Sequence, residues 1–235
     1  MKKDYKVILF DLDRTLWDFD KNSDLVIAQL LDRYDLYAKG IPSLEIFMEK
    51  YIEINEMLWG KLRKGTITKE GVRDARFYET CLHFGLDSSK IGKKMGADYV
   101  AECPYQTLLM PGTIELLDYL HGKYEMGIVT NGFTKTQWIK LNNTGLKKYF
   151  TGITIAEDVG VYKPKQKIFK AAMAEFDPKY KAQDYLMVGD HWQGDIGGAK
   201  QMGMDQAFLN LKDKEVKDGT CTYHFTELLA LKDIL

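Results

Sequence analysis

The 235-residue chain has few cysteines and no excess of either charge. Its three cysteines are far apart and odd in number, so they fit neither a disulfide framework nor a metal-ligand spacing (Cys81, Cys103 and Cys221). This usage predicts a reducing, cytoplasmic compartment. The net charge is -1, from 33 basic and 34 acidic residues. Such a balance argues against a partner that is a nucleic acid polymer or an anionic membrane surface.

Long hydrophobic runs are also missing. The apolar run that follows Met1-Lys2-Lys3 is too short for the core of a signal peptide, and no other run could span a bilayer. Hydrophobic residues nevertheless make up 45% of the chain, enough for a sizeable core. The length fits one large α/β domain or two small ones.

The most informative stretch is an apolar run, Val7 to Phe10, that ends in Asp11 and Asp13. Such a run predicts a buried strand of a parallel sheet. Carboxylates are costly to bury unless they are paired or bind a metal, and ligands of open α/β sheets bind beyond the carboxyl ends of the strands. Two residues apart on an extended chain, both acids would point to the same side. The alternative is a turn in which one Asp caps the next segment.

Residues 17–110 carry helical periodicity without a second strand-like run. Four helices are predicted, with starting caps at Asn22 or Ser23, at Pro42-Ser43, at Thr68, and at Ser88 or Ser89. Successive helices joined by short turns predict a small bundle. Because the bundle interrupts an α/β pattern, we expect it to be an inserted cap domain.

In the remainder of the chain, strands and helices alternate. Strands are predicted over 7–10, 126–129, 152–155, 185–188 and 206–209. This alternation predicts an α/β fold with a doubly wound parallel sheet and right-handed crossovers. The predicted domains are a core of residues 1–16 and 111–235 and a helical cap of residues 17–110.

Polar residues follow each main strand. Besides the two acids of the first strand, the ends of the later strands supply a hydroxyl, an amide, an amine and two more acids (Thr130, Asn131, Lys163, Asp190 and Asp195). Clustered carboxylates repel one another unless a cation separates them. Mg²⁺ suits such a site, because it takes carboxylate, water and phosphate oxygens.

The other groups suit a phosphate. Lys163 supplies positive charge, and Thr130 and Asn131 supply hydrogen-bond donors. Phosphoryl transfer needs mainly positioning and charge neutralisation. Asp11 would be the nucleophile, and Asp13 would act as general acid and then as general base.

Each of these signals has an ordinary alternative. Lys163 lies in a basic stretch that could be a solvated helix face, with Lys165, Lys167 and Lys170. Thr130-Asn131-Gly132 could be a strand-ending turn, and Asp190 and Asp195 could be helix caps. What favours a site is that the signals occur together, each at a strand end.

The four motifs together resemble the haloacid dehalogenase (HAD) superfamily: Asp11-Leu12-Asp13-Arg14-Thr15, then Ile128-Val129-Thr130-Asn131-Gly132, then Lys163-Pro164, then Gly189-Asp190 with Asp195. The resemblance implies a Rossmann-like core with a C1-type cap. It implies that Asp11, the main-chain carbonyl of Asp13 and Asp190 hold Mg²⁺, with Asp195 in support. It also implies that Thr130 and Lys163 hold the phosphoryl group.

The residue at position 13 narrows the expected chemistry. The position of Asp13 is not acidic in the dehalogenase branch, so an acid there points to phosphate-ester hydrolysis. Many relatives continue Lys-Pro with Asp-Pro, whereas this chain has Lys165-Gln166, which leaves open whether Lys165 assists Lys163. His191 follows Asp190 directly and could touch the site.

The chain further resembles the pyrimidine 5'-nucleotidase branch. The resemblance is carried by Thr15-Leu16-Trp17-Asp18-Phe19, by Gly65-Thr66-Ile67-Thr68 with Arg73 and Arg76-Phe77, and by Thr130-Asn131-Gly132-Phe133. Trp59, Arg73 and Arg76 would then meet a base or sugar, although such residues are more often core or rim. The leading hypothesis is a Mg²⁺-dependent phosphomonoesterase acting on nucleoside 5'-monophosphates, as a monomer or homodimer. The alternatives are a sugar-phosphate or phosphoglycolate-type phosphatase, a β-phosphoglucomutase-like phosphomutase, and a non-catalytic HAD-fold binding domain.

Overall fold

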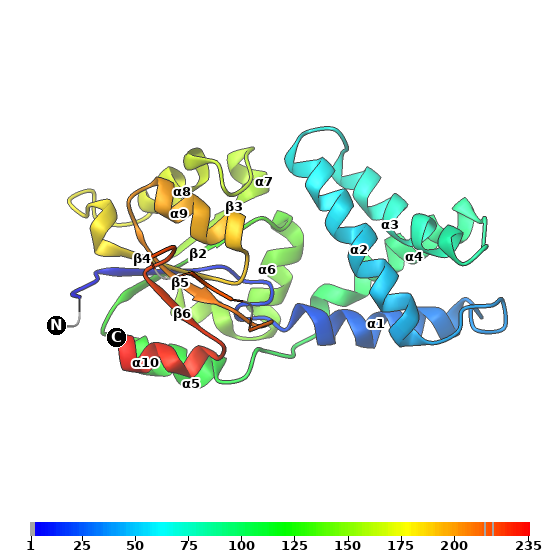
Figure 1. The fold of residues 1–235 in the computed structure, drawn as a ribbon, viewed down its shortest axis with the longest axis horizontal. Coiled ribbons are helices and arrows are strands. Elements are labelled where there is room, and N and C mark those ends of the chain that lie inside the picture. The colour runs from blue at the N-terminus through cyan, green and yellow to red at the C-terminus, as the bar shows by residue number, and fades with distance from the viewer. Residues whose placement is uncertain (1–2, 214, 218) are drawn as a thin grey trace. The chain divides into compact units, whose positions relative to one another are not determined.

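The computed structural model describes residues 3–213, 215–217 and 219–235. Its contacts divide the chain into two compact units, Met1–Phe19 with Thr107–Leu235, and Asp20–Gln106. Figure 1 shows a sheet with helices in the first unit and helices alone in the second. That the helical unit works as a cap domain stays a prediction.

The first unit is built on a parallel sheet of six strands in the order β3-β2-β1-β4-β5-β6. Its strands are β1 (Val7–Phe10), β2 (Glu125–Thr130), β3 (Gly152–Ile155), β4 (Tyr185–Gly189), β5 (Asp205–Leu209) and β6 (Tyr223–Phe225). The chain order reverses beside β1, which pairs with both β2 and β4. Ligands of doubly wound sheets bind at this switch point. The predicted Rossmann-like α/β fold is confirmed.

The sixth strand was not predicted. β6 has three residues, and His224 at its centre is exposed. A strand this short at the edge of a sheet has no apolar run to mark it, because only one of its residues needs to be buried. The other strands were predicted to within a residue at each end.

Helices cover both faces of the sheet in this unit. Figure 1 shows α8 (Gln166–Met173) and α9 (Gly197–Gln201) on one face and α5 (Thr113–Leu120) and α10 (Leu231–Ile234) on the other. α6 (Thr134–Asn143) follows β2, and the short α7 (Ala156–Val159) follows β3. A π-helical turn, Trp192–Ile196, leads into α9.

Strand β1 is buried on both faces, as its sequence predicts. Val7 and Leu9 belong to a cluster of buried side chains that includes Phe169 of α8. On the opposite face, the ring of Phe10 lies edge-on to that of Phe150, with 6.3 Å between centroids. Burying each large apolar side chain contributes about 1.5–3 kcal/mol. The strand therefore gives Asp11 a rigid support.

The second unit contains α1 (Phe19–Arg33), α2 (Leu44–Arg63), α3 (Lys69–His83) and α4 (Ser89–Glu102). The predicted caps of the last three are confirmed, since Ser43, Thr68 and Ser88 accept hydrogen bonds from main-chain N–H groups three residues on.

The predicted start of α1 is wrong. The helix begins at Phe19, and Asn22 and Ser23 lie inside it, fully buried. The Ser23 hydroxyl is hydrogen-bonded to that of Tyr99, 2.7 Å away in α4. The sequence predicts caps at both small polar residues because it gives no sign of a buried partner.

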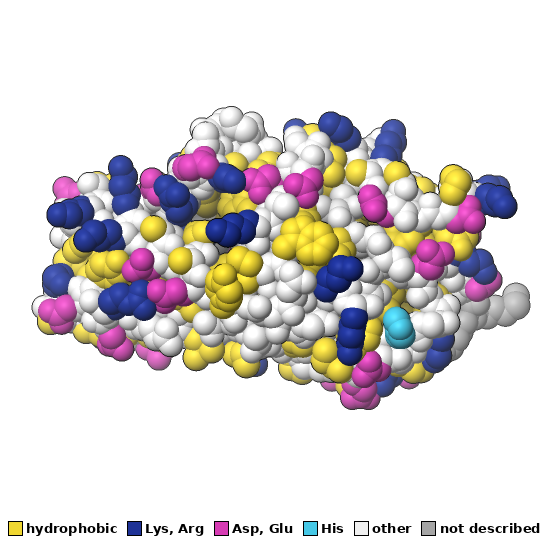
Figure 2. Space-filling model, turned by 180° about the vertical axis from the view of Figure 1, so that it is seen from behind, with side chains coloured by type: hydrophobic (Ala, Val, Ile, Leu, Met, Phe, Trp, Pro, Cys, Tyr) yellow, Lys and Arg dark blue, Asp and Glu magenta, His cyan; other side chains and the backbone are white. Residues whose placement is uncertain are grey.

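The surface mixes charges of both signs. Figure 2 shows basic and acidic side chains interspersed on one face of the molecule, as the near-zero net charge predicts. None of the helices in the described part of the chain has the length and apolar character that crossing a bilayer requires.

Candidate active site

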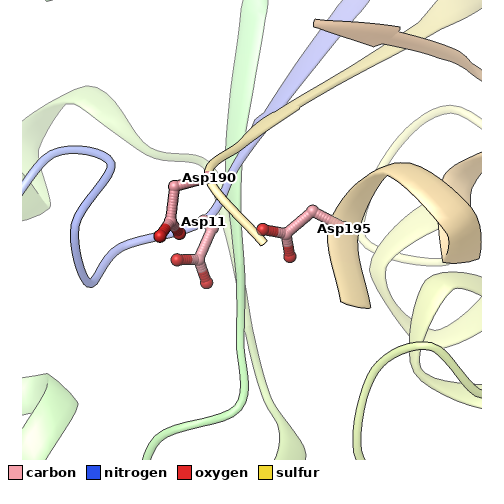
Figure 3. Close-up of side chains that lie close together, drawn as sticks. All are labelled: Asp11, Asp190 and Asp195. Atoms are coloured by element: carbon pink, nitrogen blue, oxygen red, sulfur yellow. The ribbon is translucent and has the colours of Figure 1, made fainter. Parts of the chain in front are cut away.

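Three carboxylates meet at the switch point of the sheet. Asp11 follows β1, Asp190 follows β4, and Asp195 lies in the π-helical turn (Figure 3). One oxygen from each lies within 4.8 Å of the others. Asp11 and Asp190 are close because β1 and β4 are paired in register, and the Asp11 N–H donates to the carbonyl of Val188 at 2.9 Å.

Burial and mutual repulsion disfavour the ionised forms of these carboxylates. Burial raises the pKa of Asp11 to about 7, against the opposing influence of Lys163. Burial and the neighbouring carboxylates also hold the pKa of Asp190 well above its usual range. A donor set made only of carboxylate oxygens suits a hard divalent cation, which would favour the ionised forms. The residues present therefore fit Mg²⁺.

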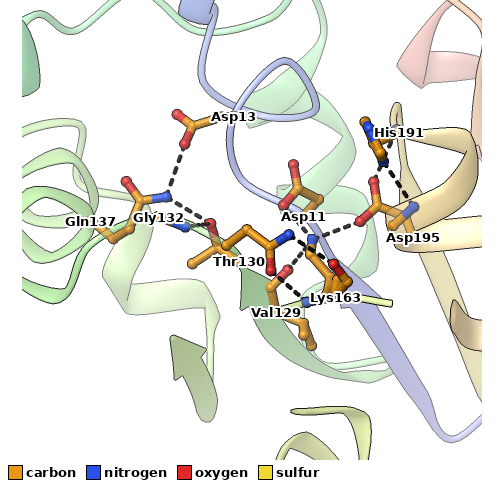
Figure 4. Close-up of polar contacts among 11 residues, drawn as sticks. Asp11, Asp13, Val129, Thr130, Gly132, Gln137, Lys163, His191 and Asp195 are labelled. Carbon is orange, nitrogen blue, oxygen red and sulfur yellow. Dashed lines mark hydrogen bonds and ion pairs between the residues drawn. The ribbon is translucent and has the colours of Figure 1, made fainter. Parts of the chain in front are cut away.

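Lys163 is the cation already in the site. Its amine is almost fully buried and lies 2.6 Å from both Asp11 Oδ1 and Asp195 Oδ1. It also donates to the carbonyl of Val129 at 2.6 Å (Figure 4). Burial opposes the charge, but the two carboxylates outweigh burial and raise the pKa of the amine. Lys165 is exposed, so Lys163 is the lysine that reaches the cluster.

Asn131 holds the lysine in place. Its Oδ1 accepts from the Lys163 main-chain N–H at 2.6 Å, and its Nδ2 donates to the Lys163 carbonyl at 3.2 Å. The peptide bond from Lys163 to Pro164 is cis. The observed partner of Asn131 is thus the loop that carries Lys163, and its expected contact with phosphate stays a prediction.

Asp13 lies outside the carboxylate cluster. Lys140 Nζ lies 2.5 Å from Asp13 Oδ1, and Gln137 Nε2 donates to Asp13 Oδ2 at 2.9 Å. The same Gln137 amide donates to Thr130 Oγ1 at 2.7 Å (Figure 4). The two acids of the first motif therefore have separate surroundings, one in the cation site and one beside α6.

Gln137 and Lys140 were not predicted as site residues. Both are buried on α6. They lie on one face of the helix with Leu141, because these three residues are at positions i, i+3 and i+4. The available sequence signal was their helical spacing with the apolar Leu141. In a short polar helix, the ordinary interpretation is a solvated face.

His191 supports the π-helical turn. Its main-chain N–H donates to Asp195 Oδ2 at 3.0 Å, and its Nδ1 accepts from the Gly194 N–H at 2.8 Å. The turn is therefore capped by His191, and not by Asp190 or Asp195. A Cβ at Gly189 would overlap the Asp195 carboxylate, which explains a glycine before Asp190.

Comparison with known proteins identifies the family. A model of the haloacid dehalogenase-like hydrolases matches residues 5–203. The chain belongs to this family. The predicted enzyme class, a HAD-family phosphoric monoester hydrolase, is confirmed.

Several relatives resemble the chain over most of its length. The pyrimidine 5'-nucleotidase YjjG of Escherichia coli is 31% identical, over 100% of this chain and 99% of the relative. The pyrimidine 5'-nucleotidase PynA of Streptococcus pneumoniae is 31% identical, over 88% of this chain and 84% of its own length. The structure of YfnB from Bacillus subtilis, bound to magnesium, superposes with a TM-score of 0.87 at 29% identity and covers 99% of both chains.

Proposed function

We propose that this HAD-family hydrolase removes phosphate from nucleoside 5'-monophosphates, through an aspartyl-phosphate formed on Asp11. The observation that carries the mechanism is the separation of the two acids. Asp11 lies among the groups that would hold a cation, whereas Asp13 is hydrogen-bonded outside that cluster. One carboxylate is thus set for attack and the other for proton transfer.

The proposed roles follow from these positions. Asp11, the carbonyl of Asp13 and Asp190 would hold Mg²⁺, with Asp195 in support. When bound, the ion would neutralise charge on the phosphoryl oxygens. Lys163 would supply further positive charge beside these oxygens, and the Thr130 hydroxyl would donate a hydrogen bond to one of them.

The proposed reaction has two steps. First, a carboxylate oxygen of Asp11 bonds to phosphorus, the ester P–O bond breaks, and the Asp13 carboxyl gives its proton to the leaving oxygen. Then a water oxygen bonds to phosphorus, the bond to Asp11 breaks, and Asp13 takes a proton from the water. The helical unit would exclude other water as a cap.

The nucleotide preference rests on the relatives. Two proteins named pyrimidine 5'-nucleotidases match this chain at 31% identity. We extend the activity in their names to this chain, as its leading substrate class. A cytoplasmic location, and a monomer or homodimer, stay predictions.

A phosphate-release screen with Mg²⁺ tests the proposal. It compares uridine, cytidine and thymidine 5'-monophosphates with purine 5'-monophosphates, a nucleoside 3'-monophosphate, sugar phosphates and phosphoglycolate. We expect kcat/KM for a pyrimidine 5'-monophosphate to exceed kcat/KM for each of the other substrates by at least about tenfold, or about 1.4 kcal/mol. A sugar phosphate or phosphoglycolate as the best substrate would replace the nucleotidase proposal. Isomerised sugar phosphate without free phosphate would instead indicate a phosphomutase.

A further inference from the structure

Gln137 and Lys140 of α6 form a polar pair that joins two parts of the proposed machinery. Both residues of this α6 pair are hydrogen-bonded to Asp13, and Gln137 is also hydrogen-bonded to Thr130. All four residues belong to the same compact unit. The inference below rests on the proposed function, because it takes Asp13 as the acid and base and Thr130 as a phosphate ligand.

Lys140 is not an ordinary surface lysine. Its side chain is only 5% exposed, and its amine lies 4.1 Å from the ring centroid of Trp17. Lysines are almost never buried unless they are paired, and the partner of this one is Asp13 Oδ1. Because the aromatic ring and the carboxylate enclose the amine, the stem cannot swing into solvent without leaving Asp13 uncompensated.

Gln137 is fully buried and uses its amide group for two hydrogen bonds. One N–H donates to Asp13 Oδ2 and the other to Thr130 Oγ1. The amide can reach both because Gly132 leaves room: a Cβ there would overlap the Gln137 side chain. The glycine that ends Thr130-Asn131-Gly132 therefore makes space for the α6 pair.

The hydrogen bonds of Thr130 have a direct consequence for its proton. A hydroxyl has one proton to donate and two lone pairs that accept. Thr130 Oγ1 accepts from Gln137 and also from the Gly132 N–H, at 3.2 Å. With both lone pairs occupied, the hydroxyl can make a further hydrogen bond only as a donor, which is what a phosphoryl oxygen needs.

We infer that Gln137 and Lys140 are positioning residues of the reaction. Lys140 and Gln137 fix the two oxygens of Asp13, so that the carboxyl faces the leaving oxygen. Gln137 also commits the Thr130 proton to the phosphoryl group. One short helix thus aligns the group that binds phosphate with the group that moves the proton.

The inference predicts different effects for substitutions at the two residues. Two substrates distinguish these effects. p-Nitrophenyl phosphate has a leaving group that departs without a proton, whereas a nucleoside 5'-monophosphate needs one from Asp13. The quantity to compare is kcat/KM, which reports the steps up to formation of the phospho-enzyme. Competitive inhibition by inorganic phosphate reports phosphate binding apart from chemistry.

For Lys140→Met, we expect kcat/KM on the nucleotide to fall about 10- to 100-fold, since a small misplacement of a catalytic group costs this much. On p-nitrophenyl phosphate, we expect a fall of less than about threefold, with phosphate inhibition unchanged within about twofold. Lys140→Arg should restore most of the nucleotide activity. An equal loss on both substrates would show a general structural role and overturn the inference for Lys140.

For Gln137→Met, which keeps the size of the side chain, phosphate inhibition should weaken about 10- to 150-fold, as expected for one lost hydrogen bond to a charged group. Activity should fall on both substrates. Gln137→Glu should be worse, because its carboxylate faces Asp13 and takes the Thr130 proton. Unchanged phosphate inhibition in both variants would overturn the inference for Gln137.

Lys135→Met is the matched control, since Lys135 is exposed on the same helix. It should match the parent on both substrates. If Lys140→Met does not fold, Lys140→Gln carries the same comparison. Failure of the proposed function is distinguishable, because it would show as absence of phosphate release in the parent chain itself.

Discussion

Replacing Lys163 by methionine tests whether this buried amine compensates the carboxylate cluster. The change keeps most of the side-chain volume and removes the charge. In the parent, the amine lies 2.6 Å from Asp11 and from Asp195. Removing one partner of a buried ion pair costs about 3–5 kcal/mol, because the remaining charge is left without compensation.

That magnitude can be measured by thermal unfolding in metal-free buffer. For a chain of this length, 1 kcal/mol corresponds to about 2–4 °C, so the midpoint of Lys163→Met should fall by about 6–20 °C. Mg²⁺ supplies positive charge to the same oxygens. It should therefore raise the midpoint of the variant by more than it raises that of the parent.

The matched control is Lys167→Met, at an exposed position four residues further along. Its free energy of unfolding should change by no more than about 0.5 kcal/mol. A loss of less than about 1 kcal/mol for Lys163→Met without metal would contradict the compensating role of the amine, because removing one partner of a buried ion pair costs more than that.

Three further predictions concern the same site. Asp13→Asn should lower kcat/KM on a nucleotide by about 10²–10⁴-fold and have less effect on p-nitrophenyl phosphate, in a phosphate-release assay. Burial raises the pKa of Asp11 to about 7, and metal binding needs the ionised carboxylate, so Mg²⁺ affinity by calorimetry should be full above that pH and weaken as the pH falls below it. Gly189→Ala should displace Asp195 and destabilise the metal-free protein by about 1–3 kcal/mol in denaturant unfolding, since its Cβ would overlap that carboxylate.

The sequence predicted the acidic end of the site because its residues directly follow strands. Parallel strands bring their carboxyl ends to one edge of the sheet, so Asp11 and Asp190 had to meet once β1 and β4 were neighbours. Lys163 lies on a loop after β3. It was predicted to join those acids because that loop begins at the same edge of the sheet. Strand-end residues are predictable because burial of the strand fixes their position.

The α6 pair was not predictable in the same way. Gln137 and Lys140 lie on a helix, and their direction depends on how α6 packs against Asp13 and Thr130. Local sequence does not encode that packing, and a buried lysine carries no mark in composition. The misplaced start of α1 has a related cause, since Ser23 is held inside the helix by its hydrogen bond to Tyr99.

If Asp11 forms a covalent phospho-enzyme, Asp11→Asn removes the nucleophile and leaves the shape of the side chain nearly unchanged. The measurement is release of phosphate from a pyrimidine nucleoside 5'-monophosphate with Mg²⁺ present, beside the parent and with folding checked by circular dichroism. An amide of the same shape cannot attack phosphorus, so the rate should fall by at least about 10³-fold. A variant that releases phosphate as fast as the parent would contradict the covalent mechanism.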